Sequence, residues 1–206
     1  MKITVLKEGV HESKPGKGKI TNITQPICGS VTLIQGIKNI IVDTGNFGYE
    51  EEIIKKLQDN GLIPEQIDYV INTHGHFDHC SNNYLFRDAV RVLGDLVWSP
   101  NKKVEAYQKP EDIEIPDIKI ISTPGHKEEH ISVVVKTDKT YVIAGDAIQE
   151  DKIRTDGYKD NPDKEQIIKS ILKILNIAYI IIPGHGPIIE KKTIEELKKI
   201  VDSWRQ

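Results

Sequence analysis

Three histidines and one aspartate fall within six consecutive residues of this chain, in the segment His74-Gly75-His76-Phe77-Asp78-His79. The segment follows Ile67–Thr73, a run of apolar and β-branched residues that predicts a buried strand. Because side chains alternate along a strand, His74 and His76 are expected on one side, and a turn would bring Asp78 and His79 to a second position nearby. Imidazole and carboxylate groups together suit zinc, iron or manganese. The chain is therefore expected to fold with a metal site at the end of a strand.

Three more residues with metal-ligand side chains follow predicted strands elsewhere in the chain. His126 and His185 each come directly after a Pro-Gly pair, and Asp146 comes after a glycine. The strands before them are predicted over Ile118–Ser122, Tyr141–Ala144 and Ala178–Ile182. Because ligand and catalytic residues usually lie on loops held by a rigid scaffold, we expect these three residues to meet the first cluster at one shared edge of the sheets.

The order of short strands and amphipathic helices indicates the fold class. Helical periodicity predicts helices over Tyr49–Asn60, Asp163–Leu175 and Thr193–Trp204. Thr193 and Glu196 have the spacing of a capping box at the start of the last helix. Further strands are predicted over Ile3–Leu6, Thr24–Ile34, Ile40–Val42, Val90–Leu93 and Ile131–Val135. This pattern predicts one mixed α/β or α+β domain over residues 1–206 and leaves the strand order open.

The composition is that of a globular protein with a small negative charge. Hydrophobic residues make up 38% of the 206 residues, charged residues make up 29%, and the formal net charge is −3. This charge does not indicate a nucleic-acid-binding surface, although it leaves a local basic patch as an alternative. No apolar run reaches the ~18 residues of a membrane span, and the charged start of the chain argues against a signal peptide. Two cysteines, Cys28 and Cys80, make no disulfide scaffold, so a cytoplasmic location is expected.

Taken in order, these motifs closely resemble those of the metallo-β-lactamase superfamily. The residues that carry the resemblance are Val42-Asp43-Thr44-Gly45, His74-Gly75-His76-Phe77-Asp78-His79, His126, Asp146 and His185. The resemblance implies an α+β fold, namely a four-layer αβ/βα sandwich of two packed β-sheets flanked by helices, with the metals at one open edge. Within the superfamily the chain is most similar to short single-domain members.

The resemblance also implies a role for each residue. One metal would be bound by His74, His76 and His126, the second by Asp78, His79 and His185, and Asp146 would bridge the two. Asp43 would support the ligands through hydrogen bonds, and the alternative is a turn residue after a strand. His130 would order the site or touch the substrate, and the alternative is a plain loop histidine.

This ligand set implies two divalent metal ions, with zinc favoured and iron or manganese as alternatives. A hydroxide that bridges two such ions is a nucleophile at neutral pH. With Asp78 and Asp146 as the catalytic carboxylates, we expect a metal-dependent hydrolase. Its substrate would be an ester, a thioester or a phosphodiester.

Other interpretations stay open. A mononuclear iron oxygenase of the persulfide dioxygenase type shares the fold and much of the motif, and a non-catalytic metal-binding protein is a further alternative. Nuclease action on RNA is attributed to short single-domain members, and the stretch Lys14–Lys19 could form a basic lip, although a solvated loop is the simpler explanation. Trp204 could serve a homodimer interface or the core. His11 has no motif around it and is expected to be exposed.

Overall fold

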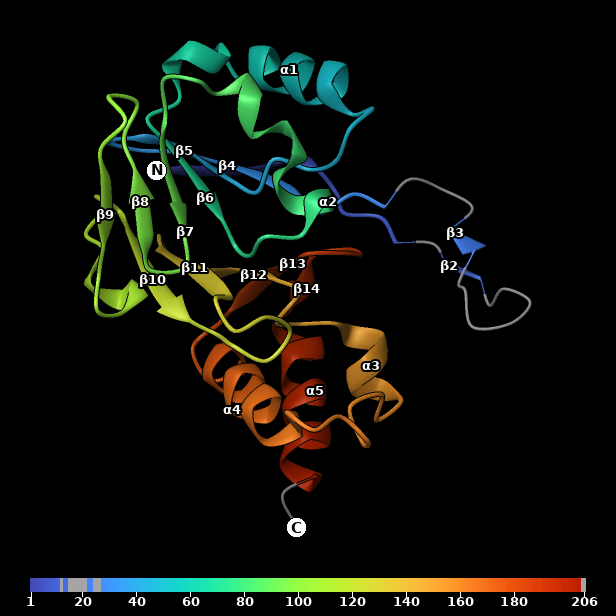
Figure 1. The fold of residues 1–206 in the computed structure, drawn as a ribbon. Helices are drawn as coiled ribbons and strands as arrows, with labels where there is room; N and C mark the ends of the chain where they lie inside the picture. The colour runs from blue at the N-terminus through green and yellow to red at the C-terminus, as the bar shows by residue number, and fades with distance from the viewer. Residues whose placement is uncertain (12, 15–21, 24–26, 205–206) are drawn as a thin grey trace.

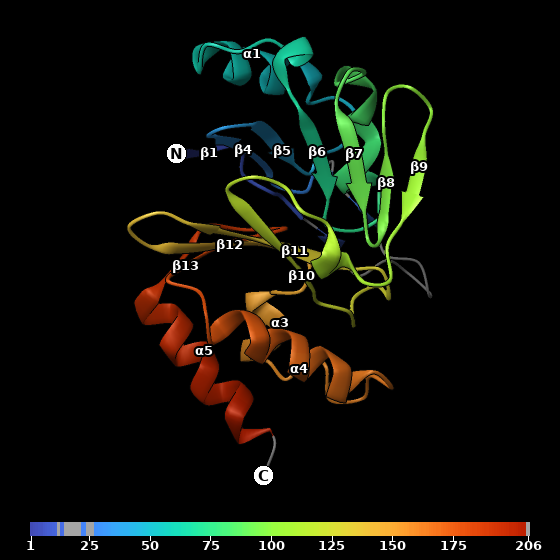
Figure 2. The ribbon, with the colours of Figure 1, turned by 90° about the vertical axis from the view of Figure 1, so that its left-hand side faces the viewer.

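Two β-sheets pack face to face in the computed structural model of this chain, and helices cover the outer face of each sheet (Figure 1; Figure 2). The structure describes residues 1–11, 13–14, 22–23 and 27–204. The four layers follow the chain, because the first sheet and its helix come from the first half and the second sheet and its helices come from the second half.

The first sheet has seven strands in the order β1-β4-β5-β6-β7-β8-β9. Strand β6 is the central strand and runs parallel to both β5 and β7, while the other neighbours are antiparallel. The bounds are β1 Lys2–Lys7, β4 Val31–Gln35, β5 Asn39–Val42, β6 Tyr69–Asn72, β7 Val90–Leu93, β8 Leu96–Trp98 and β9 Val104–Ala106. A separate two-stranded ribbon pairs β2 (Ser13–Lys14) with β3 (Asn22–Ile23).

The second sheet has five strands in the order β10-β11-β12-β13-β14. Strands β12 and β13 are parallel and the other pairs are antiparallel. The bounds are β10 Ile118–Ser122, β11 Ile131–Lys136, β12 Thr140–Gly145, β13 Ile180–Pro183 and β14 Ile189–Glu190. The loops that follow β10, β12 and β13 each carry one of the ligand residues predicted from the sequence.

Three hydrophobic cores separate the four layers. Ile71 of β6 and Ile143 of β12 belong to the core between the two sheets. Helix α1 (Glu50–Asp59) buries Ile53 and Leu57 against the outer face of the first sheet. The outer face of the second sheet is covered by α3 (Glu150–Arg154), α4 (Lys164–Leu175) and α5 (Lys191–Ser203). These layers confirm the predicted four-layer sandwich. Trp204 packs at the edge of the third core beside Tyr158, with ring centroids 6.3 Å apart.

Short helical turns make up the remaining elements. Helix α2 spans Phe77–Cys80, directly after the loop that follows β6, and the 3₁₀ turns are η1 Pro64–Gln66, η2 Ser81–Leu85 and η3 Pro110–Asp112. Each helix within the described residues is too short or too polar to cross a membrane.

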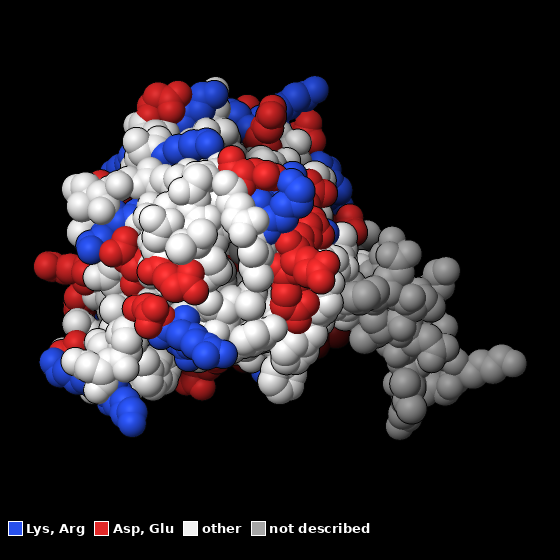
Figure 3. Space-filling view, turned by 90° about the horizontal axis from the view of Figure 1, so that it is seen from above, with Lys and Arg blue, Asp and Glu red and all other residues white. Residues whose placement is uncertain are grey.

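The surface over α1 carries charges of both signs. Glu50, Glu51 and Glu52 occupy the first turn of this helix, and Lys56 lies in the last turn. Seen from above, acidic and basic side chains are interspersed over the described part of this face (Figure 3). Such a face offers no continuous basic surface to a phosphate backbone.

Two predicted element boundaries were wrong for identifiable reasons. The strand predicted over Thr24–Ile34 begins only at Val31, because the amides of Gly29 and Ser30 donate to the carbonyls of Asp78 and Gly184, both at 2.8 Å, and not to a neighbouring strand. Residues 24–26 of that prediction lie outside the described residues, as do residues 15–19 of the lysine-rich loop.

The last helix also begins earlier than its predicted capping box. Helix α5 starts at Lys191, directly after strand β14, with Glu190 in extended conformation at its cap position. Thr193 and Glu196 therefore lie inside the helix, and the predicted capping box was wrong. Among the strands, β8 and β9 were not predicted, because each has only three residues, which is too short to show the period-two pattern of a strand.

The core between the sheets gives a stability prediction. Ile143 is 1% exposed at the centre of that core, whereas Ile37 is 75% exposed. Ile143→Ala leaves a cavity between two rigid sheets and should lower the free energy of unfolding by about 2–5 kcal/mol. Ile37→Ala should change it by less than ~0.5 kcal/mol. Urea unfolding followed by circular dichroism measures both, and equal effects would contradict the assignment of this core.

Candidate metal centre

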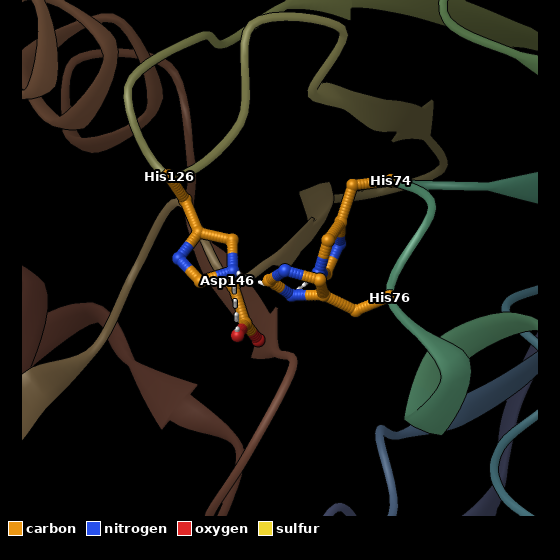
Figure 4. Close-up of side chains that lie close together, drawn as sticks. All are labelled: His74, His76, His126 and Asp146. Carbon is orange, nitrogen blue, oxygen red and sulfur yellow. Dashed lines mark hydrogen bonds and ion pairs between the residues drawn. The ribbon is translucent and has the colours of Figure 1, made fainter.

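Four side chains from three loops converge in the first group of candidate ligands (Figure 4). His74 and His76 come from the loop after β6, His126 from the loop after β10, and Asp146 directly follows β12. His76 Nδ1 lies 2.9 Å from His74 Nε2 and 3.0 Å from His126 Nε2. Asp146 Oδ2 lies 3.3 Å from His126 Nε2. The donor atoms of the four residues all lie within 4.8 Å of one another.

A second group of three side chains adjoins the first. Asp78 and His79 lie in α2, and His185 lies in the loop after β13. Asp78 Oδ2 is 3.2 Å from His185 Nε2 and 3.6 Å from His79 Nε2. The donor atoms of these three residues also lie within 4.8 Å of one another.

Asp146 faces both groups. Its Oδ2 points to His126, while its Oδ1 lies 3.3 Å from His79 Nε2 and 3.5 Å from His185 Nε2. The carboxylate is 6% exposed and fits only because residue 184 is a glycine, since a Cβ there would collide with Asp146 Oδ1. Thus one carboxylate lies where two sets of imidazoles meet.

The donor atoms fit divalent cations. Ring nitrogens of three histidines face one another at hydrogen-bond distance, and only some of them can carry a proton. Within the described residues, His79 Nε2 and Asp146 Oδ1 are buried and make no hydrogen bond. Leaving such atoms unpaired costs about 1–3 kcal/mol each, and a cation between them would remove that cost. Imidazole nitrogens with carboxylate oxygens are a usual donor set for zinc.

Burial keeps the first group of imidazoles neutral. Burial lowers the pKa of His74 far below its ordinary value, and the neighbouring His79 and His130 lower it further. Burial also lowers the pKa of His126 to about 4, although the charge of Asp146 opposes it. Neutral imidazole is the form that binds a metal, so no proton has to leave these two rings at pH 7.

His79 lies in a more negative environment. Burial lowers its pKa, but the charges of Asp43 and Asp146, the hydrogen bond to Asp43 and the close approach of Asp146 outweigh burial and raise the pKa to about 10. Burial raises the pKa of Asp146, but the charge and close approach of His79 outweigh burial and hold that pKa well below its ordinary value. The carboxylates around His79 therefore attract positive charge, which a divalent cation would supply.

Asp43 orients histidines of both groups. The His79 Nδ1–H group donates to Asp43 Oδ2 at 2.8 Å, which turns Nε2 toward Asp146. Thr73 donates to the same carboxylate from its amide at 2.7 Å and from its hydroxyl at 2.8 Å. Because the hydroxyl proton goes to Asp43, the Thr73 oxygen accepts from His74 Nδ1 at 3.1 Å, and His74 Nε2 keeps a free lone pair. The backbone of Asp43 has a φ of 56°, a conformation that aspartate tolerates better than most residues.

His130 lies behind His74 and not on the surface. Its ring is fully buried and stacks on the His74 ring, with centroids 5.1 Å apart and planes at 26°. Its Nδ1 is 2.9 Å from the hydroxyl of Thr123, which in turn lies 2.9 Å from the hydroxyl of Ser132. Burial lowers the pKa of His130 to about 3.

Several residues that lie at the site were not predicted from the sequence. Gln149 donates from Nε2 to Asp146 Oδ2 at 3.2 Å, and the exposed His11 ring lies 5.3 Å from the His185 ring. Thr73 adjoins the histidine motif, so its position could have pointed to a role. His11 is distant from every motif, and no local pattern marks it. The two thiols lie outside the ligand groups: Cys28 is buried, with its pKa raised by burial to about 11, and Cys80 is half-buried.

Known proteins resemble this chain in sequence. The family model of the metallo-β-lactamase superfamily matches residues 28–99. The chain is 37% identical to a probable metallo-hydrolase of Methanocaldococcus jannaschii, over 75% of this chain and 74% of that protein. It is 33% identical to metallo-β-lactamase domain-containing protein 1 of Xenopus laevis, over 77% of this chain and 71% of that protein. The chain belongs to the metallo-β-lactamase superfamily.

Solved structures share the fold at low identity. A crystal structure of a Thermotoga maritima protein superposes with a TM-score of 0.68 at 20% identity, covering 91% of this chain and 98% of that one. The subclass B3 metallo-β-lactamase BJP-1 of Bradyrhizobium japonicum gives a TM-score of 0.59 at 14% identity, with 86% of each chain covered. The arrangement of the two sheets is thus that of metallo-β-lactamases.

The contacts of Asp43 give a testable prediction. In Asp43→Asn the amide group presents a donor to the His79 Nδ1–H group, so the His79 proton moves to Nε2, the atom that faces Asp146. Zinc affinity should fall about 10- to 100-fold, as is usual when the partner of a ligand histidine is changed. Competition with a chromophoric chelator measures this affinity. The exposed Asp138→Asn is the matched control, and equal affinities in the two variants would contradict the role of Asp43.

Proposed function

We propose that this protein is a hydrolase that uses two zinc ions to cleave an ester, thioester or phosphodiester bond. The observation that carries the proposal is the position of Asp146, whose two oxygens face two separate groups of ligand residues. The proposed ligands are His74, His76, His126 and Asp146 for one ion and Asp78, His79, His185 and Asp146 for the other.

The chemistry of such a pair is well defined. Two such ions, when bound, would lower the pKa of a bound water and polarise the substrate oxygen. The protein supplies the arrangement: Asp43 fixes His79 directly and His74 through Thr73, and the His130 ring backs the His74 ring. Asp78 and Asp146 would contribute the negative charge that holds the ions.

The substrate would approach from the half-buried side of the site. His74 and His79 are fully buried, whereas His76, His126 and His185 are partly exposed. The partly exposed rings therefore mark the side of the centre that solvent and substrate reach. This leaves room for an open coordination position, which catalytic metal sites require.

Metal content and activity measured on one sample test the proposal. The protein is purified without added metal or chelator, and its metals are counted by elemental mass spectrometry. The same sample is then assayed on bis(p-nitrophenyl) phosphate and on a simple thioester. About two zinc ions per chain with hydrolysis of either substrate supports the proposal. About one iron per chain, oxygen uptake with a persulfide and no hydrolysis would replace the proposal with an iron oxygenase.

The second ligand group gives a residue-level prediction. Asp78→Ala removes a carboxylate that lies 3.2 Å from His185 Nε2. It should deplete one of the two ions and lower kcat/KM by about a hundredfold or more, while the circular dichroism spectrum stays the same. Asp59→Ala, an exposed change in α1, is the matched control. Turnover in Asp78→Ala equal to that of the control would contradict the two-metal mechanism.

A further inference from the structure

A pocket of about 400 Å³ opens beside His185, between the segment Gly9–His11 and the first turn of α3. This volume lies within the range of small-molecule sites in proteins. His185 belongs both to the wall of this pocket and to the second ligand group. A molecule bound at the metal centre would therefore extend directly into the pocket.

The segment Gly9–His11 is held firmly against the ligand loop. The amide of Gly186 donates to the carbonyl of Gly9 at 2.9 Å, and His185 Nδ1 donates to the carbonyl of Val10 at 3.2 Å. A Cβ on Gly9 would collide with the carbonyl of Gly184, so this close approach requires glycine. These contacts place the exposed His11 ring edge-to-face against His185, at 5.3 Å between centroids and 70° between planes. The His11 ring therefore forms part of the pocket wall, and these contacts hold it there.

The lining of the pocket combines apolar residues with a rim that is not basic. Its apolar residues are Val10, Pro183, Pro187 and Ile189, and Pro187 is exposed. The charged residues of the rim are two acids and one base, Glu150, Asp151 and Lys152. An apolar surface gains free energy by burying hydrocarbon, whereas a rim with more acids than bases disfavours a polyanion.

We propose that this pocket receives the uncharged acyl chain of an ester or thioester substrate, with the His11 ring as its outer wall. The inference rests on the proposed hydrolase function and narrows its substrate class to carboxylic esters and thioesters with a hydrocarbon chain. The role of His11 is to contact the substrate, because its ring is exposed and lies outside both ligand groups.

Chain-length dependence is the first test. With p-nitrophenyl esters the leaving group stays constant while the acyl chain grows from acetate to hexanoate. Because burying one methylene is worth about a fourfold factor, burial of two of the four extra methylenes is enough to raise kcat/KM about tenfold, which is the smallest increase that we expect. A rate that stays flat or falls with chain length would overturn the proposal.

Filling the pocket is the second test, and the chain offers a matched pair of variants. Pro187 lines the pocket, whereas its neighbour Ile188 is 47% exposed and does not. Pro187→Trp should bring the hexanoate-to-acetate ratio of kcat/KM close to one, while the zinc content stays the same. Ile188→Trp should keep the wild-type ratio, and equal ratios in the two variants would overturn the assignment.

The wall formed by His11 is tested by truncation and rescue. His11→Ala should raise the ratio of the hexanoate KM to the acetate KM about threefold or more. His11→Phe keeps a ring at this position without its nitrogens and should restore the wild-type ratio. Failure of phenylalanine to rescue would show that His11 acts through its nitrogen atoms, contrary to the proposal.

Binding measured without turnover separates this inference from the proposed function. Methyl NMR of the zinc-loaded protein titrated with 1-hexanol should shift the Ile189 methyl signal and leave that of Ile37 unchanged. If no ester, thioester or phosphodiester is hydrolysed but hexanol shifts Ile189, the hydrolase proposal fails and the pocket stands. If esters are hydrolysed but hexanol leaves Ile189 unshifted, the pocket proposal fails and the hydrolase stands.

Discussion

The buried carboxylate of Asp43 is the interaction on which the site depends. It accepts two hydrogen bonds from Thr73 and one from His79. The Thr73 hydroxyl in turn accepts a hydrogen bond from His74, so the orientation of the His74 ring also depends on Asp43. One carboxylate therefore sets the ring orientation of a histidine in each ligand group. Such a charge is tolerated in the interior only because its lone pairs are satisfied by several donors. The ligand atoms are in this way fixed by the protein itself.

The sandwich explains why residues so distant in sequence meet. Parallel strands of one sheet end at the same edge, and β6 and β12 are the central strands of their sheets. When the two inner faces pack through Ile71 and Ile143, the ends of these strands are brought opposite each other. The histidine motif after β6 thereby faces Asp146 after β12. Packing energy between the sheets holds the geometry of the site.

The sequence allowed much of the fold and the candidate ligands to be predicted, because both rest on local patterns. The strands around the ligands are apolar runs, and the histidine motif concentrates four donors in six residues. Tertiary contacts decided the features that were missed. Gly29 donates to Asp78 in α2 and Ser30 donates to Gly184 in the loop after β13, so neither extends β4. Thr123 contacts His130 only after two strands pair. His11 reaches His185 across 174 residues of sequence, and no local pattern encodes that contact.

The position of Asp146 between two ligand groups is the centre of the account, and anomalous diffraction from crystals of the zinc-loaded protein tests it most directly. The account predicts two anomalous peaks per chain at the zinc edge. One peak would lie among His74, His76 and His126, the other among Asp78, His79 and His185, with Asp146 between them. A single peak at full zinc loading, or a peak remote from Asp146, would contradict the account.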